Sequence, residues 1–267
     1  MEQVAGSLKS ELHQAPCEIV AQKEQRGAIP PVSVAVSLYN YKDYILPCLE
    51  SVRAQTIPHL DLIVVDDCSI DGSSDVVHDW LATHGDHFSR YLLISHHSNQ
   101  GLPTTRNTGL AHARTEYVFV LDADNLLYPR CLERLASALD HCDASFAYCY
   151  LEKFGDVSCL QNTKPWNPSI FQHGNTIDAM VLLRKYVWEQ VGGYATDMII
   201  MGWEDFELWF KIARIKGWGI AVPEILARYR THRRSMLNTL TNPNAHKLWG
   251  YLRSKYPEFF SGVSTIR

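Results

Sequence analysis

Apolar and polar residues alternate along residues 31 to 140 in a pattern that is typical of an α/β protein. Short apolar runs predict buried strands, and the longer amphipathic stretches between them predict helices. The predicted strands span residues 32–37, 60–67, 91–95 and 117–122. The predicted helices span residues 43–55, 73–84, 103 onward, and 129–140. Because strand and helix alternate four times, we expect an α/β fold with a mostly parallel central sheet and helices on both faces.

The pattern is less regular outside that region. We expect residues 1–29 to form a polar lead-in with partial helix at most. Apolar stretches predict two further strands, at residues 146–155 and 180–185. Periodic apolar positions predict helices at residues 204–213 and 243–260, the second with Leu248, Trp249 and Leu252 directed inward. We expect that last helix to pack on the core, with contact to a membrane surface or a partner as the alternative.

Composition limits the classes of protein to which the chain can belong. With 267 residues, 46% of them hydrophobic, it is long enough for one principal core. Lys and Arg total 25 against 29 Asp and Glu, and the resulting net charge of −4 provides no basic field for nucleic acid. The N-terminus lacks the apolar run of a signal peptide, and no stretch of about 18 apolar residues indicates a membrane-spanning helix.

Cysteine usage indicates the compartment. The seven cysteines are odd in number, scattered and without a CxxC pair, so they favour reduced thiols over a disulfide framework or a zinc site. The sequence therefore predicts a cytoplasmic protein with no nucleic-acid partner and no integral membrane segment. A peripheral location at a membrane stays open, because an enzyme can work beside a membrane without spanning it.

Polar side chains gather where three of the predicted strands end. These residues are Ser37, Tyr39, Asn40, Asp66, Asp67, Asp122 and Asp124. In open α/β sheets, ligands bind in the crevice beyond the carboxyl ends of the strands, so we expect these side chains to face one site. The alternative is a scatter of turn residues, since Asp and Asn also favour turns for local backbone reasons.

The segment DAD, residues 122–124, sets two carboxylates close together. Like charges at this spacing repel unless a cation or hydrogen bonds offset them. Carboxylate oxygens suit Mg²⁺ or Mn²⁺, which take one or two protein carboxylates and complete their shells with water and substrate phosphates. The segment thus predicts a metal that bridges to a phosphorylated ligand, although D-x-D by itself is a weak motif.

The sequence offers no glycine-rich loop as an alternative to a metal for binding phosphate. The sequence contains neither GxGxxG after the first strand nor GxxxxGK[ST] anywhere. Arg106 stands near the start of the third predicted helix, where an arginine and free backbone amides can approach an anion. A solvent-facing or acid-paired arginine is the alternative.

Six sequence blocks carry a resemblance to a known family. Four collinear blocks between residues 32 and 130 are VSVAVSLYNYKDYILPCLESVRAQT, LIVVDDCSIDGSSD, NQGLPTTRNTGLAHA and YVFVLDADNLLYP. Two later blocks are GGYATDMIIMGWEDFELWFKIARIKGW and YRTHRRSM. Together they resemble the family 2 glycosyltransferases with the GT-A fold, a Rossmann-like fold of nucleotide-diphospho-sugar transferases. The resemblance covers about residues 31–237.

The resemblance implies a domain organisation. Residues 30–238 would form the GT-A domain, with a nucleotide-sugar-binding half at 30–130 and an acceptor-side half at 131–238. An N-terminal extension of residues 1–29 would precede it, and a C-terminal helical extension of residues 239–267 would follow.

The resemblance also implies a donor site that binds the nucleotide. In such enzymes, the end of the first strand contacts the nucleotide, which here points to Ser37 and Tyr39. The second acid of the DD pair reads the uracil edge, which points to Asp67. A basic residue at the position of Arg106 contacts the base or the diphosphate.

The same resemblance implies a metal site that uses Mn²⁺ or Mg²⁺. The first Asp of D-x-D lies near the ribose and the last coordinates the metal, so Asp122 and Asp124 receive those roles. A histidine of the closing segment completes the metal or phosphate contacts, and His232 is the candidate. A surface or structural histidine is the alternative for His232.

The GWEDFE segment supplies carboxylates for the acceptor side. A carboxylate assists attack by an acceptor hydroxyl when it removes the proton, and Asp205 is the candidate base. Glu204 is the candidate contact to the acceptor hydroxyl, and Trp203 offers an aromatic face to a sugar. These acids also suit the first turn of a helix, and Glu207 is a rival base. The segment 162–175 is either part of the acceptor wall or a structural loop.

The implied function is a metal-dependent, inverting glycosyltransferase in polysaccharide or glycoconjugate synthesis. The donor would be a nucleotide sugar, most simply a UDP-sugar that carries a hexosyl or N-acetylhexosaminyl group. The acceptor would be a carbohydrate, lipid-linked or protein hydroxyl. A sugar-nucleotide pyrophosphorylase and a catalytically inactive nucleotide-sugar-binding module are the alternatives, and a glycoside hydrolase would also use paired carboxylates.

Overall fold

The computed structural model describes residues 15–25, 30–198, 200–233 and 235–260. The strands are β1 (Cys17–Glu24), β2 (Val32–Leu38), β3 (Asp61–Asp66), β4 (Arg90–His96), β5 (Tyr117–Asp122), β6 (Leu126–Leu127), β7 (Phe146–Gly155), β8 (Cys159–Gln161), β9 (Val181–Arg184) and β10 (Gly219–Thr231). The α-helices are α1 (Lys42–Arg53), α2 (Ser73–His84), α3 (Leu102–His112), α4 (Cys131–Asp140), α5 (Lys185–Gln190), α6 (Glu204–Arg214) and α7 (Ala245–Lys255). Shorter helical turns are Gly85–His87, Pro168–His173, Leu237–Thr241, Asn242–Asn244 and Pro257–Phe259.

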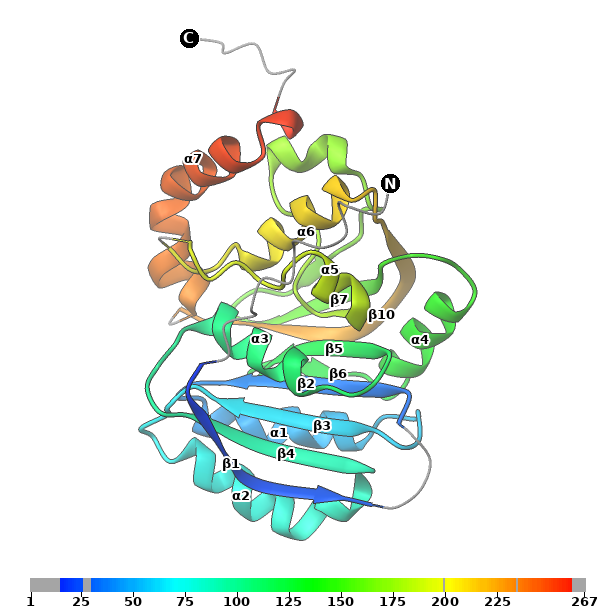
Figure 1. The fold of residues 1–267 in the computed structure, drawn as a ribbon, viewed down its shortest axis with the longest axis vertical. Helices are drawn as coiled ribbons and strands as arrows, with labels where there is room; N and C mark the ends of the chain where they lie inside the picture. Colours follow the sequence, from blue (N-terminus) through cyan, green and yellow to red (C-terminus); the bar gives the residue numbers. More distant parts are fainter. Residues whose placement is uncertain (1–14, 26–29, 199, 234, 261–267) are drawn as a thin grey trace, which may run out of the picture.

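Within the described residues, ten strands form one sheet (Figure 1). Its order is β1-β4-β3-β2-β5-β9-β7-β10-β6, and β8 pairs with β7. Strands β4, β3, β2 and β5 are parallel neighbours, as are β7 and β10, whereas β1, β6, β8 and β9 run antiparallel to their partners. The fold is thus α/β with a mixed, mostly parallel sheet, as the sequence predicts.

The four predicted strands of the first half are confirmed as β2, β3, β4 and β5. Every residue of β2 and β3 is buried, because helices cover both faces of the sheet. The register pairs Leu38 with Asp66 and Ser37 with Asp122. The carboxyl ends of β2, β3 and β5 therefore meet at one edge, where the polar residues follow.

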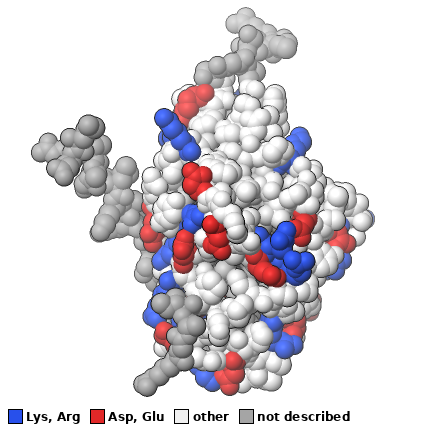
Figure 2. Space-filling view, turned by 90° about the vertical axis from the view of Figure 1, so that its right-hand side faces the viewer, with Lys and Arg blue, Asp and Glu red and all other residues white. Residues whose placement is uncertain are grey.

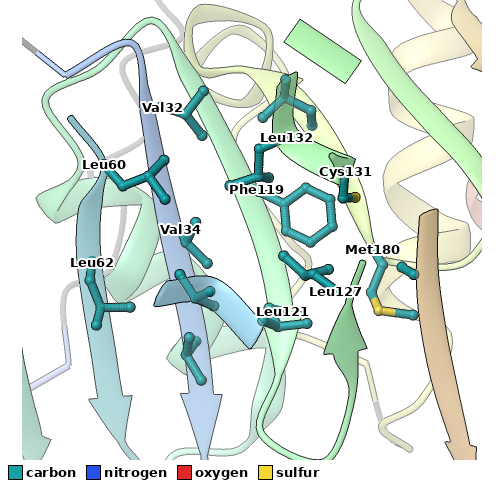
Figure 3. Close-up of a cluster of buried hydrophobic side chains, with 14 of the residues drawn as sticks. Val32, Val34, Leu60, Leu62, Phe119, Leu121, Leu127, Cys131, Leu132 and Met180 are labelled. Carbon is teal, nitrogen blue, oxygen red and sulfur yellow. The ribbon is translucent and has the colours of Figure 1, made fainter. Parts of the chain in front are cut away.

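Two layers of helices sandwich this sheet. Side chains of successive strand residues point to opposite faces. On one face, Val34 and Leu62 belong to a cluster that includes Cys131 and Leu132 of α4 (Figure 3). Residues of α1 and α2 complete this cluster. On the other, Ala35 and Ile63 pack with residues of α3, α5 and α6. The expected helices at residues 43–55, 73–84, 103 onward and 129–140 are confirmed within two residues at each boundary that the sequence defines.

The second half extends the sheet. Strand β9 lies between β5 and β7, and both β7 and β9 confirm predicted strands. Helices α6 and α7 confirm the two later helices, although α7 ends at Lys255 rather than at residue 260. Leu248 and Leu252 of α7 are buried as expected, and Trp249 is partly buried against the same core. The pattern did not predict β10. Its pairing with β7 shifts register between Val222 and Ala227, around Pro223, so apolar and polar positions do not alternate regularly along it.

The N-terminal lead-in differs from expectation. Residues Cys17–Glu24 form β1, paired antiparallel with β4 at the edge of the sheet, where partial helix was expected. Most side chains of β1 are exposed, so its pairing with β4 holds the strand in place. Its sequence therefore lacks the regular apolar pattern by which a buried strand is predicted. Residues 1–14 and 26–29 of the predicted N-terminal extension, and residues 261–267 of the C-terminal one, lie outside the described residues. The domain boundaries stay a prediction.

Candidate active site

A cavity of about 830 Å³ opens at the carboxyl ends of β2, β3 and β5. All ten residues to which the resemblance assigns a donor, metal, acceptor or base role line it. These residues are Ser37, Tyr39, Asp67, Arg106, Asp122, Asp124, Trp203, Glu204, Asp205 and His232. Six segments that are distant in sequence therefore converge on one space, which a scatter of turn residues would not produce.

The DAD turn is fixed by its backbone. The Ala123 amide donates to the carbonyl of Ser37 in β2 (3.1 Å). Arg230 Nε of β10 donates to the carbonyl of Asp124 (2.9 Å), and Asn125 Oδ1 accepts from the Arg230 amide (2.9 Å). These bonds tie the turn to strands on both sides, so both carboxylates have fixed positions at the cavity wall.

Asp124 and His232 meet at this wall. His232 Nε2 lies 3.3 Å from Asp124 Oδ2, and its ring stacks on Tyr44 with 5.8 Å between centroids. Burial, and then Asp122, raises the pKa of Asp124 to about 7. Burial, and then Arg230, lowers the pKa of His232, so its imidazole is neutral near pH 7. A buried carboxyl group beside a neutral imidazole is a donor set in which a bound cation would favour the carboxylate form.

Arg106 binds two carboxylates, one from each half of the site. It donates from Nη2 to both oxygens of Asp122 (3.0 Å each) and from Nη1 to Glu204 Oε1 (2.8 Å). Its side chain is only 3% exposed. Burial alone lowers the pKa of Arg106, but Asp122 and Glu204 outweigh burial and raise it. Arg106 is therefore paired with acids in this structure, which was the alternative interpretation of the sequence. The resemblance implies a different contact, to the base or the diphosphate of the donor.

Asp67 holds the loop before α3. Its oxygens accept from the backbone amides of Gln100 and Gly101 (2.8 Å each), and Oδ1 lies 2.7 Å from Nδ1 of His96. A carboxylate offers about four lone-pair directions, so one remains for a ligand. The resemblance implies a uracil contact at this residue, and that role stays a prediction.

The GWED segment begins α6 at the opposite wall. Glu204 Oε2 accepts from the Gly202 amide (2.7 Å), so both oxygens of this buried acid have partners inside the chain. Gly202 has φ of +113°, and a Cβ there would lie 1.9 Å from Thr241 Oγ1, so only glycine fits. Asp205 faces the cavity, and Asn175 Nδ2 donates to its Oδ2 (2.9 Å). Burial, and then Glu204, raises the pKa of Asp205 well above its ordinary value.

Glu207, the rival base, lies elsewhere. Its side chain is fully buried, accepts from the hydroxyl of Tyr256 and lies 3.1 Å from Nζ of Lys211. It is not among the residues that line the cavity. The geometric requirement on a base therefore favours Asp205 over Glu207.

Sequence reasoning missed several residues of the cavity wall. Asp178, between the 162–175 segment and β9, faces the cavity, and one of its oxygens accepts from the Met180 amide (3.0 Å). Lys153 and Gln161, on β7 and β8, also line it. None of these three residues follows an apolar run at the end of a parallel strand. The rule that located Asp67, Asp122 and Asp124 therefore does not apply to them.

Asp178 is expected to reduce stability near neutral pH. Burial, offset only in part by the Met180 amide, raises its pKa from 3.8 to about 6. A raised carboxyl pKa means that the folded state binds more protons than the unfolded state between these values, so the free energy of unfolding falls as pH rises through that window. Asp178→Asn should increase the free energy of unfolding by up to about 3 kcal/mol at pH 7.5.

Urea unfolding at pH 7.5 and at pH 4.5 measures this effect. The gain from Asp178→Asn should shrink at the lower pH, because the wild-type carboxyl is then largely protonated in the folded state. Asp143→Asn is the matched control, since Asp143 is exposed and outside the cavity. A variant at Asp178 no more stable than the control at pH 7.5 would contradict the expected desolvation.

Comparison with protein-family models matches residues 33–195 to the model described as glycosyl transferase family 2. The chain belongs to glycosyl transferase family 2. Bacillus subtilis EpsH is 37% identical to this family 2 chain over 115 residues, which cover 43% of the chain and 32% of EpsH. The match therefore spans about a third of the length of that relative.

Solved structures share the fold of this family 2 chain. Staphylococcus aureus TarS in complex with UDP-GlcNAc has a TM-score of 0.63 and 19% identity, with 78% of this chain and 60% of that chain covered. The mannosyltransferase PcManGT of Pyrobaculum calidifontis, in complex with GDP-Man and Mn²⁺, has a TM-score of 0.62 and 24% identity, with 94% and 68% covered. The GT-A-like fold that the resemblance implies is therefore confirmed.

Two further observations concern the surface charge and the helices of the family 2 chain. Acidic and basic side chains are interspersed on the face shown in Figure 2, consistent with the net charge of −4. In the described part of the chain, no helix combines the length and hydropathy that a bilayer crossing needs.

Proposed function

We propose that this chain is a metal-dependent, inverting glycosyltransferase that moves a sugar from a nucleoside diphosphate, most simply UDP, to an acceptor hydroxyl. One observation carries the proposal. The Asp122–Asp124 turn and Asp205 line the same cavity from opposite halves of the chain, and Arg106 joins the two halves. A phosphate-binding turn and a carboxylate base on two sides of one space are what a direct displacement at an anomeric carbon requires.

The donor side consists of Ser37, Tyr39, Asp67, Asp122 and Asp124. Tyr39 is 44% exposed at the rim, and Asp67 retains one lone-pair direction for a base. Asp122 supports the donor at the position implied for the ribose, with its carboxylate oriented by Arg106. The two hydroxyls and three carboxylates here suit a nucleoside diphosphate better than a nonpolar ligand.

Asp124 and His232 fit a divalent cation such as Mn²⁺ or Mg²⁺. No group of three or more His, Cys, Asp and Glu among the described residues is arranged to hold a metal alone. That small ligand number is typical of cations that keep water and substrate phosphates in their shells. A bound cation would favour the carboxylate form of Asp124, and so would lower the pKa that burial raises. When bound, it would neutralise charge on the departing diphosphate.

The acceptor side consists of Trp203, Glu204 and Asp205. Trp203 presents an aromatic surface, and Glu204 fixes the start of α6 through Gly202 and Arg106 while it lines the acceptor space. Asp205 accepts the proton from the acceptor hydroxyl while the hydroxyl oxygen bonds to the anomeric carbon and the bond to the diphosphate breaks. This single displacement inverts the anomeric configuration and needs no covalent enzyme intermediate.

Product analysis tests this function against the alternatives. The chain is incubated with UDP-glucose, UDP-galactose, UDP-N-acetylglucosamine or GDP-mannose, with Mn²⁺ and a mixture of simple glycoside acceptors. We expect release of the nucleoside diphosphate and, by proton NMR, a product of inverted anomeric configuration. Formation of a nucleoside triphosphate and a sugar 1-phosphate on addition of pyrophosphate would instead identify a pyrophosphorylase, and binding without turnover would identify an inactive binding module.

A further inference from the structure

Three polar side chains form a separate group on one wall of the cavity. They are Lys153 of β7, Gln161 of β8 and Asp178. Strands β7 and β8 pair antiparallel, with Lys153 opposite Cys159 and Gln161 opposite Leu151. The amide of Asp178 donates to the side chain of Asn162, the residue after Gln161 (2.9 Å). The hairpin and the loop before β9 are therefore tied together.

The group lacks partners of its own within the described residues. Gln161 Oε1 is buried and accepts no hydrogen bond there. Lys153 Nζ has no carboxylate oxygen within 4.0 Å in that part of the chain, and its printed contact is with the ring of Tyr229, 5.8 Å from the centroid. Only one Asp178 oxygen accepts a hydrogen bond there. Buried polar groups are normally hydrogen-bonded, so these atoms are suited to a ligand.

The group shares its cavity with both reactive walls. Asp124 and His232 of the diphosphate side and Asp205 of the acceptor side line the same space as Asp178. In a direct displacement, the transferred sugar lies between the leaving phosphate and the attacking hydroxyl. The sugar would therefore occupy the cavity whose wall carries this group.

We infer that Lys153, Gln161 and Asp178 bind the hydroxyl groups of the transferred sugar and determine which sugar is accepted. The inference rests on the proposed function and deepens it. A sugar hydroxyl both donates and accepts, and this group offers ammonium donors, a carboxylate acceptor and an amide that does both. A site built to bond a hydroxyl discriminates strongly against a sugar that lacks it or presents it in the other orientation.

Calorimetry with Mn²⁺ present tests the group separately from nucleotide binding. UDP-glucose, UDP-galactose, UDP-N-acetylglucosamine and GDP-mannose are each compared with their own free nucleoside diphosphate. We expect one sugar to add affinity in the unaltered chain. Asp178→Asn and Lys153→Met should each lower that nucleotide sugar's affinity about tenfold or more, and change that of the free nucleotide less than about twofold.

Two surface variants are the matched controls. Asp143→Asn and Lys164→Met make the same chemical changes at exposed positions outside the cavity and should leave both affinities unchanged. The inference is overturned if the Asp178 and Lys153 variants weaken free and sugar-bearing nucleotides equally, if they weaken neither, or if no sugar adds affinity in the unaltered chain. Absence of any nucleotide binding would instead contradict the proposed function, and the inference with it.

Discussion

Replacing Asp205 with Asn is expected to lower the rate of sugar transfer by about 10²- to 10⁴-fold, the usual effect of removing a general base. Asn keeps the shape of the side chain and its bond to Asn175, but it cannot take a proton at neutral pH. UDP affinity should stay nearly unchanged, because Asp205 lies on the acceptor wall. Steady-state transfer rates and calorimetric UDP affinity, measured on the same preparation, separate the two effects.

The pH profile adds a second readout for Asp205. Because burial and Glu204 raise its pKa, the active carboxylate form is lost as pH falls, and the acid limb of the transfer rate should lie above the ordinary carboxyl range. Glu207→Gln is the discriminating variant, since Glu207 lies outside the cavity. It should reduce stability and leave turnover per folded molecule intact. Wild-type transfer in Asp205→Asn, or loss of transfer confined to Glu207→Gln, would remove Asp205 as the base.

Replacing Arg106 with Met is expected to have the largest combined effect on stability and transfer. The variant leaves Glu204 buried and Asp122 beside the cavity without their shared cation, and breaking a buried ion pair in this way costs about 3–5 kcal/mol. In the molecules that remain folded, transfer should fall about 10²-fold or more, because the donor turn and the start of α6 lose their common anchor. Urea unfolding and turnover per folded molecule measure the two parts.

Two further variants show whether the Arg106 effect is specific. Arg106→Lys keeps the charge but cannot contact both acids with a planar fork, so its defect should be intermediate. Arg184→Met removes another arginine that is mostly buried and holds three backbone carbonyls outside the cavity. It should destabilise the chain without altering turnover per folded molecule. If Arg106→Met also kept full turnover per folded molecule, Arg106 would be purely structural.

The first half of the fold follows directly from the sequence. Strand β5, at Tyr117–Asp122, has the predicted bounds, because a strand covered on both faces must be apolar along its length and Asp122 marks where the apolar run ends. The same rule located Asp67, Asp122 and Asp124. It does not locate β1, an edge strand whose side chains are mostly exposed, or β10, whose register shifts interrupt the alternation.

The partners of the charged residues were less predictable than their positions. A motif indicates that Arg106 and Glu204 belong to the site, but the bond between residues 98 positions apart depends on how α3 and α6 pack on the same face of the sheet. Asp178 and Gln161 carry no motif at all. The antiparallel pairings of β8 and β9, two short strands, bring them to the cavity, and a pairing of this kind is set by tertiary contacts rather than by local pattern.

The most direct test of the central claim is a calorimetric titration of UDP into the chain with Mn²⁺ and again with excess EDTA. We predict measurable binding with Mn²⁺ and at least about a tenfold loss with EDTA, because Asp124 and His232 supply too few groups to hold a diphosphate without a cation. Asp124→Asn should bind weakly under both conditions. Equal UDP affinity in Mn²⁺ and in EDTA would contradict the account.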